Sequence, residues 1–207
     1  YPTKDGEVTE ILLKDKVYPF EIKQYYKAYQ GTDIISTWIE IMNNGKKSVT
    51  LYRFVSAYLP VQRGDNWLTH FHGHWGAENM LEEEKLTNGQ KVISNKDGMV
   101  NTETDNPSFM LSIDGKPQEE YGIYWGVRLL GQEITFSDNP SFMLSIDGKP
   151  QEEYGHILGG TLAWTGNYLL KMDITNTKLN IIAGINEENS HYKLESKETF
   201  KTPEFAM

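Results

Sequence analysis

The chain has 207 residues and a formal net charge of −9 at neutral pH. This acidity argues against nucleic acid as a partner, because a phosphate backbone calls for a basic patch. The sequence holds no cysteine, which excludes disulfide bonds and thiolate metal sites and leads us to expect a cytoplasmic protein. No apolar stretch approaches the roughly 18 residues of a membrane span, so we expect no membrane partner.

The first clear secondary-structure signal is a strand near residue 35. Ile35, Thr37, Ile39 and Ile41 alternate with more polar neighbours, which predicts a half-buried strand. The tripeptide at residues 43–45 (Asn-Asn-Gly) is typical of a tight hairpin turn, and residues 49–59 are expected to return as the next strand.

Turn signals continue along the rest of the chain, and no window shows three turns of helical periodicity. The acidic run at residues 82–84 is expected to be a solvated turn. We therefore predict an all-β fold, a large antiparallel β-sandwich that forms a single domain over residues 1–207.

One segment occurs twice without a change. Residues 105–122 (DNPSFMLSIDGKPQEEYG) are repeated as residues 138–155. Structural repeats diverge in sequence and run through a whole chain, so a recent duplication or an engineered insertion explains this repeat better. Two identical strands cannot occupy one place in a sheet. We expect the second copy to form the core strand, because it leads directly into residues 156–167.

The densest cluster of candidate site residues lies between Arg63 and Glu78. His70, His72 and His74 occupy alternate positions, which on a strand places three imidazoles on one face. Zinc accepts three such nitrogens, yet short histidine clusters often bind nothing. We expect no metal here and no cofactor elsewhere.

Several segments resemble, in order, the N-terminal domain of the α-galactosidases of glycoside hydrolase family 36. They are the strand and turn at residues 33–45, the strand at 49–57, a Gly-x-Trp followed by Glu within 68–78, a Ser-x-x-x-Gly at 94–98, an Asn-Pro-x-Phe-x-Leu at 106–111, the strand and turn at 159–167, a Gly-Ile-Asn at 184–186 and a Phe-x-Thr-Pro-Glu at 200–204.

This resemblance implies a galactose-mutarotase-like supersandwich that precedes a catalytic (β/α)₈ barrel. The family's two catalytic aspartates belong to that barrel, and no segment here resembles the segments that carry them. The chain is therefore expected to be a fragment of a longer α-galactosidase, to carry no catalytic residue and to be inactive alone. The parent enzyme would cleave α-galactosides such as melibiose or raffinose with retention of configuration.

The resemblance also implies a role for the segment at residues 70–78 near the active-site entrance or a subunit contact. Trp75, Glu78 and His74 are the expected substrate-binding residues, since an aromatic face packs on galactose and a carboxylate accepts its hydroxyl groups. The alternative is that Trp75 belongs to the core and Glu78 to the surface.

Two other functions stay open. The chain could be a stand-alone carbohydrate-binding module, or an enzyme of the mutarotase type with a histidine acid and a glutamate base. In all three cases the expected ligand is a carbohydrate, and we expect a homo-oligomer.

Overall fold

The computed structural model describes residues 1–98, 105–113, 115–116, 157–188 and 190–207, and the side chain of Glu78 lies outside the described part. Strands dominate this part of the chain, which contains no helix. The described part accordingly offers no helix of the length and apolarity that crossing a bilayer requires. The strands are β1 (Pro2–Thr3), β2 (Gly6–Lys14), β3 (Phe20–Tyr29), β4 (Ile35–Asn43), β5 (Val49–Leu51), β6 (Val55–Gln62), β7 (Trp67–His74), β8 (Ala77–Lys85), β9 (Gly89–Ser94), β10 (Ser108–Ser112), β11 (Ile157–Leu162), β12 (Tyr168–Ile174), β13 (Lys178–Ile185), β14 (Tyr192–Leu194), β15 (Thr199–Lys201) and β16 (Phe205–Ala206).

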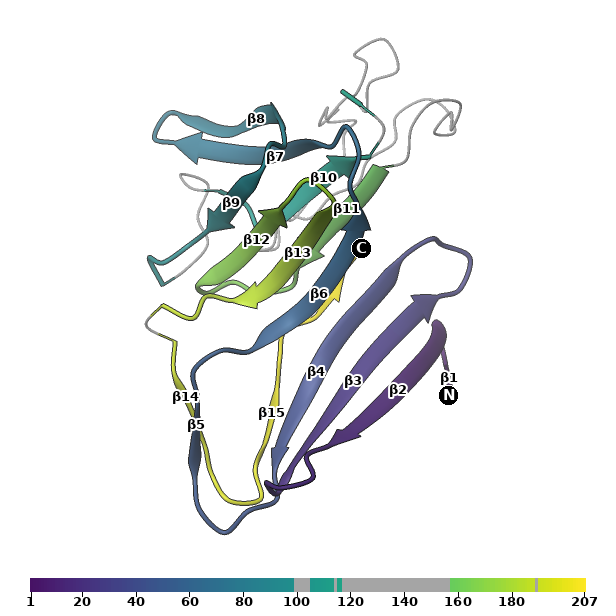
Figure 1. Ribbon diagram of the computed structural model, residues 1–207, viewed down its shortest axis with the longest axis vertical. Coiled ribbons are helices and arrows are strands. Elements are labelled where there is room, and N and C mark those ends of the chain that lie inside the picture. The colour runs from purple at the N-terminus through teal and green to yellow at the C-terminus, as the bar shows by residue number, and fades with distance from the viewer. Residues whose placement is uncertain (99–104, 114, 117–156, 189) are drawn as a thin grey trace, which may run out of the picture.

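The described strands form three antiparallel sheets. The largest has ten strands in the order β1-β2-β3-β4-β16-β11-β10-β7-β8, with β15 also paired to β4. A four-stranded sheet runs β6-β13-β12-β9, and β14 pairs with β5. Figure 1 shows β12 and β13 in front of β10 and β11, whereas β1 to β4 extend to one side. The predicted all-β sandwich is confirmed.

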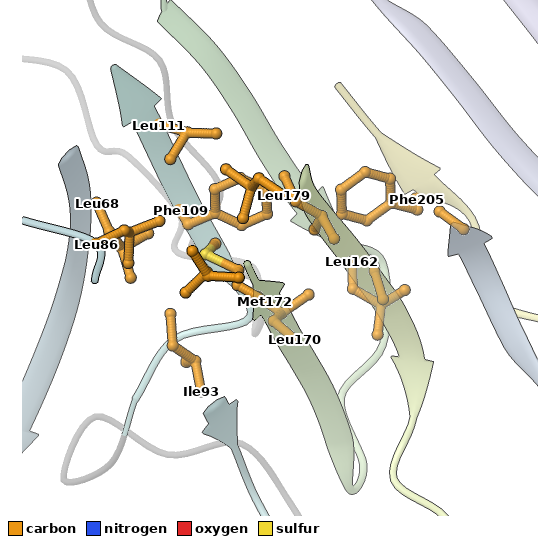
Figure 2. Close-up of a cluster of buried hydrophobic side chains, with 14 of the residues drawn as sticks. Leu68, Leu86, Ile93, Phe109, Leu111, Leu162, Leu170, Met172, Leu179 and Phe205 are labelled. Carbon is orange, nitrogen blue, oxygen red and sulfur yellow. The ribbon is translucent and has the colours of Figure 1, made fainter. Parts of the chain in front are cut away.

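The main core lies between the four-stranded sheet and the β7 to β11 part of the large sheet. Phe109 and Leu111 of β10 face Leu170 and Met172 of β12, and all four are buried (Figure 2). Burial of one such side chain stabilises the fold by about 1.5–3 kcal/mol, so this contact holds the two sheets together.

A smaller cluster covers one face of the extension formed by β2, β3 and β4. It consists of Val8, Tyr25 and Trp38, with the two aromatic rings stacked at a centroid distance of 4.9 Å. The strand predicted at residues 35–41 is confirmed as β4. Its buried face carries Trp38, however, while Ile35 is 41% exposed, because the core cluster of this extension forms on the opposite face of the strand.

The hairpin predicted after β4 is wrong. The neighbours of β4 are β3, β15 and β16, whereas β5 pairs with β14 and β6 with β13. The buried Asn43 explains the difference. Its amide nitrogen donates to the carbonyls of Lys47 at 2.9 Å and Glu195 at 3.1 Å, and its Oδ1 accepts the amide of Gly45 at 2.9 Å. These bonds hold a wide loop that carries the chain away from β4.

The expectation for the repeated segment is also wrong. The first copy supplies β10, which pairs with β7 and β11 and buries Phe109 and Leu111. The second copy, residues 138–155, lies outside the described residues. The prediction relied on the short connection from the second copy to β11. The free energy of closing a loop changes slowly with length, so a short connection confers little preference.

Candidate functional site

The candidate site occupies the hairpin formed by β7 and β8 at one edge of the ten-stranded sheet. Trp75 and Gly76 make the turn, and Gly76 has a φ of 77°, a conformation that glycine adopts without steric cost. The pairing register shifts between His72 and His74, next to this turn. Figure 1 shows the hairpin projecting at one end of the molecule.

The tip of the hairpin presents two of the three expected substrate-binding residues. Trp75 is 85% exposed, so the alternative that it belongs to the core is wrong. His74 is also exposed, and its Nδ1 lies 3.1 Å from the carbonyl oxygen of Trp75. The backbone of Glu78 lies in β8 close to this tip, but its side chain is outside the described part.

The three alternate histidines have different environments. His70 is 3% exposed and lies on β7, next to the edge strand β8. The Nδ1 of His72 lies 3.0 Å from Oδ1 of Asp105, whereas His74 faces solvent near the turn. Among the described residues, the only group of three close metal-binding side chains is His70, Glu82 and Glu84, so the three histidines do not form a common site.

Carboxylates surround His70. Its Nε2 lies 3.7 Å from Oε2 of Glu82 and 4.0 Å from Oε1 of Glu84, and its Nδ1 lies 3.9 Å from Oδ1 of Asp105. The register of β7 and β8 creates this arrangement, because His70 pairs directly with Glu82 and Glu84 is the next residue on the same face. Lys91 of β9 completes the group through an ion pair with Glu84.

The electrostatics of this group favour a neutral histidine. Burial lowers the pKa of His70, with Lys91 acting in the same direction, although Asp105, Glu82 and Glu84 partly oppose the shift. Neither ring nitrogen has a hydrogen-bond partner among the described residues. Beside this group, burial raises the pKa of the Tyr168 hydroxyl, which donates to the backbone carbonyl of Asp105.

Comparison with known proteins now places the chain. The family model for the glycosyl hydrolase family 36 N-terminal domain matches residues 1–130 and 135–195. The chain belongs to this family. The match to this family covers most of the sequence. It confirms the resemblance that the scattered motifs indicated.

Curated relatives agree with this family 36 assignment. The α-galactosidase AgaA of Geobacillus stearothermophilus is 22% identical over 205 residues, which are 99% of this chain and 23% of that protein. The bifunctional α-galactosidase/sucrose kinase AgaSK of Mediterraneibacter gnavus is also 22% identical over 205 residues, 99% of this chain and 18% of its own length. The chain therefore spans about a quarter or less of these relatives.

Solved structures support the fold of this family 36 domain. The crystal structure of AgaA superimposes on this chain with a TM-score of 0.77 at 22% identity. The superposition covers 99% of this chain and 24% of the AgaA chain. The α-galactosidase of Lactobacillus brevis gives a TM-score of 0.72 at 21% identity over 98% of this chain and 23% of that one.

Sequence reasoning missed the surroundings of His70. The acidic run at residues 82–84, expected as a solvated turn, is instead part of β8 and pairs with β7. Lys91 lies on β9 and Asp105 lies just before β10, and no sequence motif linked either residue to His70. The register of β7 and β8 brings His70 beside Glu82 and Glu84, and the packing of the two sheets brings Lys91 to the same place. Neither relationship is a local pattern in the sequence.

Proposed function

We propose that this chain acts as the non-catalytic N-terminal domain of an α-galactosidase, and that residues 1–207 form one sandwich domain of it. The observation that carries the proposal is the family-model match over residues 1–130 and 135–195. Variants of AgaA, one of the related α-galactosidases, have been crystallised with raffinose and with stachyose. The proposed substrates of the parent enzyme are therefore α-galactosides of this kind, including melibiose.

Glu82 and Glu84 do not have the arrangement of a catalytic pair. A retaining glycosidase needs two carboxyl groups that face each other across the sugar at a distance of about 5 Å. Glu82 and Glu84 leave the same strand side by side, and Lys91 pairs with one of them. Two carboxylates on one face of one strand cannot flank a glycosidic bond from opposite sides.

The proposed contribution to catalysis is made by the tip of the β7–β8 hairpin. A tryptophan exposed over 85% of its surface offers an apolar face for galactose, and His74 and Glu78 would add polar contacts beside it. In the parent enzyme this tip would form part of the active-site entrance, where it would bind the sugar without taking part in bond cleavage.

The test compares this chain with the parent enzyme on a p-nitrophenyl α-galactoside and on raffinose. The chain alone should show no turnover, whereas the parent should hydrolyse both substrates. Turnover by the chain that survives repurification and is lost on one Asp or Glu substitution would overturn the non-catalytic role. An inactive parent would overturn the assignment to an α-galactosidase.

A substitution in the parent tests the hairpin tip. Trp75→Ala should raise KM for raffinose about two- to tenfold with little change in kcat, because a stacked aromatic contributes about 0.5–1.5 kcal/mol. Tyr58→Ala serves as the control, since Tyr58 is an exposed aromatic on the four-stranded sheet. An unchanged KM in the Trp75→Ala enzyme would rule out the tip as a binding element.

The same tip also favours a second candidate, a carbohydrate-binding module that functions alone. Titration calorimetry of the isolated chain with raffinose separates the two functions. Saturable binding that Trp75→Ala abolishes would favour the stand-alone module, while an absence of binding favours the accessory domain.

We further propose that the domain self-associates and acts in the cytoplasm. Ile11, Leu12 and Leu13 are exposed on β2, beside a hollow of about 460 Å³ lined partly by Phe20 and Ile41. An apolar strand near the sheet edge suits pairing with a second copy. Light scattering of the chain and of Leu12→Glu tests this, and cell fractionation tests the location. A monomeric wild-type chain would contradict self-association.

A further inference from the structure

We propose that His70, Glu82 and Glu84 bind one divalent transition-metal ion of the zinc type. One ligand atom from each side chain can be chosen so that all three atoms lie within 4.8 Å of one another. This site lies away from the hairpin tip and goes beyond the proposed role in sugar binding.

The spacing of the three side chains suits a small cation. Zinc binds histidine nitrogen and carboxylate oxygen at about 2.0–2.2 Å, so neighbouring ligand atoms in a tetrahedral site lie about 3.4 Å apart. The Nε2 of His70 lies 3.7 Å from Glu82 and 4.0 Å from Glu84. These separations exceed hydrogen-bond length, and contractions of about 0.3 Å for Glu82 and about 0.6 Å for Glu84 would bring them to the spacing of neighbouring ligands. Glutamate side chains are flexible enough to make such movements.

His70 supplies an independent sign of a ligand. It is 3% exposed, yet neither ring nitrogen has a hydrogen-bond partner among the described residues. Buried polar groups are nearly always paired, because an unpaired group loses its hydration without compensation. A cation held between Nε2 and the two glutamates would satisfy this nitrogen and both carboxylates together.

The other ring nitrogen faces a suitable partner. Oδ1 of Asp105 lies 3.9 Å from Nδ1, on the side of the ring away from the glutamates. Histidine ligands commonly donate their second N–H to a carboxylate, which fixes the ring and increases its basicity. Asp105 is itself held in place, since its backbone carbonyl accepts from Tyr168 and its carboxylate lies 3.0 Å from Nδ1 of His72.

Lys91 would compete with a bound cation for Glu84. Its ammonium group forms an ion pair with Oε1 of Glu84 from the facing sheet. Metal binding therefore requires the lysine to release Glu84. Because Lys91 is partly exposed, its side chain can turn toward solvent, and the half-exposed Glu82 gives the ion a path to the site.

The donor set selects the type of metal. Imidazole nitrogen with two carboxylates suits zinc and its neighbours in the transition series, whereas magnesium and calcium prefer oxygen alone. The proposed site uses one of the three histidines considered in the sequence, together with two glutamates from the acidic run at residues 82–84, which was expected to be a solvated turn.

The test is a calorimetric titration of zinc chloride into the full 207-residue chain after removal of metals with EDTA. The wild-type chain should bind one equivalent, and its melting temperature should rise with added zinc. Glu82→Gln should weaken binding at least about tenfold, since even outer partners of a metal ligand cost this much. The half-exposed position of Glu82 keeps this variant folded, which circular dichroism verifies.

Two further variants make the test specific. His74→Gln removes an exposed histidine outside the site, and its affinity for zinc should equal that of the wild type. Lys91→Gln removes the competing ammonium and should increase the affinity several-fold. The proposal is overturned by a chain that binds no zinc below 100 µM, by equal affinity of the wild type and Glu82→Gln, by loss of binding in His74→Gln, or by an unchanged affinity in Lys91→Gln.

Discussion

Phe109 and Phe205 stack with ring centroids 6.3 Å apart and planes inclined by 23°, and both rings lie against Gly160. The two rings come from β10 and β16, which flank β11 on opposite sides. A Cβ atom at Gly160 would lie 2.6 Å from the ring of Phe109 and 2.7 Å from that of Phe205. The contact between these strands therefore depends on a residue without a side chain.

Gly160→Ala should accordingly destabilise the domain by about 1–3 kcal/mol, the usual cost of overpacking a core. Urea unfolding measures this change. A matched variant, Phe109→Leu, removes the closest ring atoms, and Gly160→Ala should cost less in that background. Equal costs in both backgrounds would show that the ring is not the source of the strain.

The repeated segment permits a comparison between identical sequences. Leu111→Ala in the first copy should lower the free energy of unfolding by about 2–5 kcal/mol, because Leu111 is fully buried in β10. Leu144→Ala makes the same change in the second copy and should have little effect. If each single variant loses little free energy of unfolding but the double variant loses much, then either copy can fill the strand position.

Deletion of one period tests whether both copies are needed. Removal of residues 105–137 and removal of residues 123–155 yield the same protein, because the copies are identical. This shortened chain should unfold cooperatively with an unchanged or higher melting temperature. Loss of cooperative unfolding would show that the inserted period is integral to the core.

Asn43 should contribute more to stability than its neighbour. Asn43→Ala leaves the partly buried carbonyls of Lys47 and Glu195 without their donor, so we expect a loss of about 2–3 kcal/mol. Asn44→Ala provides the control. Asn44 is half-buried with one side-chain hydrogen bond to Glu21, so its loss should cost less, about 0.5–1.5 kcal/mol. Thermal unfolding of both variants gives the comparison, and equal losses would contradict the role assigned to the Asn43 amide.

The lowered pKa of His70 predicts a pH dependence of stability in metal-free buffer. The folded state binds a proton on His70 less readily than the unfolded state, whose histidine has a pKa of about 6.5. The contribution of His70 is therefore complete above about pH 6.5 and is lost as the pH falls toward the lowered folded-state pKa. Urea unfolding between pH 7.5 and pH 5 should show a larger decline for the wild type than for His70→Gln. Equal slopes would contradict the burial effect.

The sequence predicted the class of the fold because alternation and turn residues are local signals. The strand at residues 35–41 and the absence of helices among the residues that the structure describes follow from such patterns. The partners of β4 did not follow, since Asn43 turns the chain through bonds to carbonyls that are distant in sequence. Local signals also could not choose between two identical copies of one strand.

The sequence predicted only part of the candidate site. The alternation of His70, His72 and His74 is that of a strand, and these residues lie in β7, but the turn at Trp75 and Gly76 was not predicted. Trp75 is exposed, as a residue that contacts a ligand has to be. The group around His70 depends on pairing of β7 with β8 and on the approach of Lys91 from the other sheet. Such contacts form only when the two sheets pack together, and no local pattern in the sequence predicts them.

The position of β16 has a consequence for the order of events during synthesis. Its two residues pair with Thr37 and Ser36 of β4 on one side and with β11 on the other, so they join the two halves of the ten-stranded sheet. A ribosome delivers residues 205–206 after every other strand described here, and domains tend to fold from the N-terminal side as they emerge. The Ser36–Thr37 part of the β4 edge therefore stays unpaired until these residues leave the exit tunnel, and an unpaired strand edge is prone to mispair with neighbouring chains.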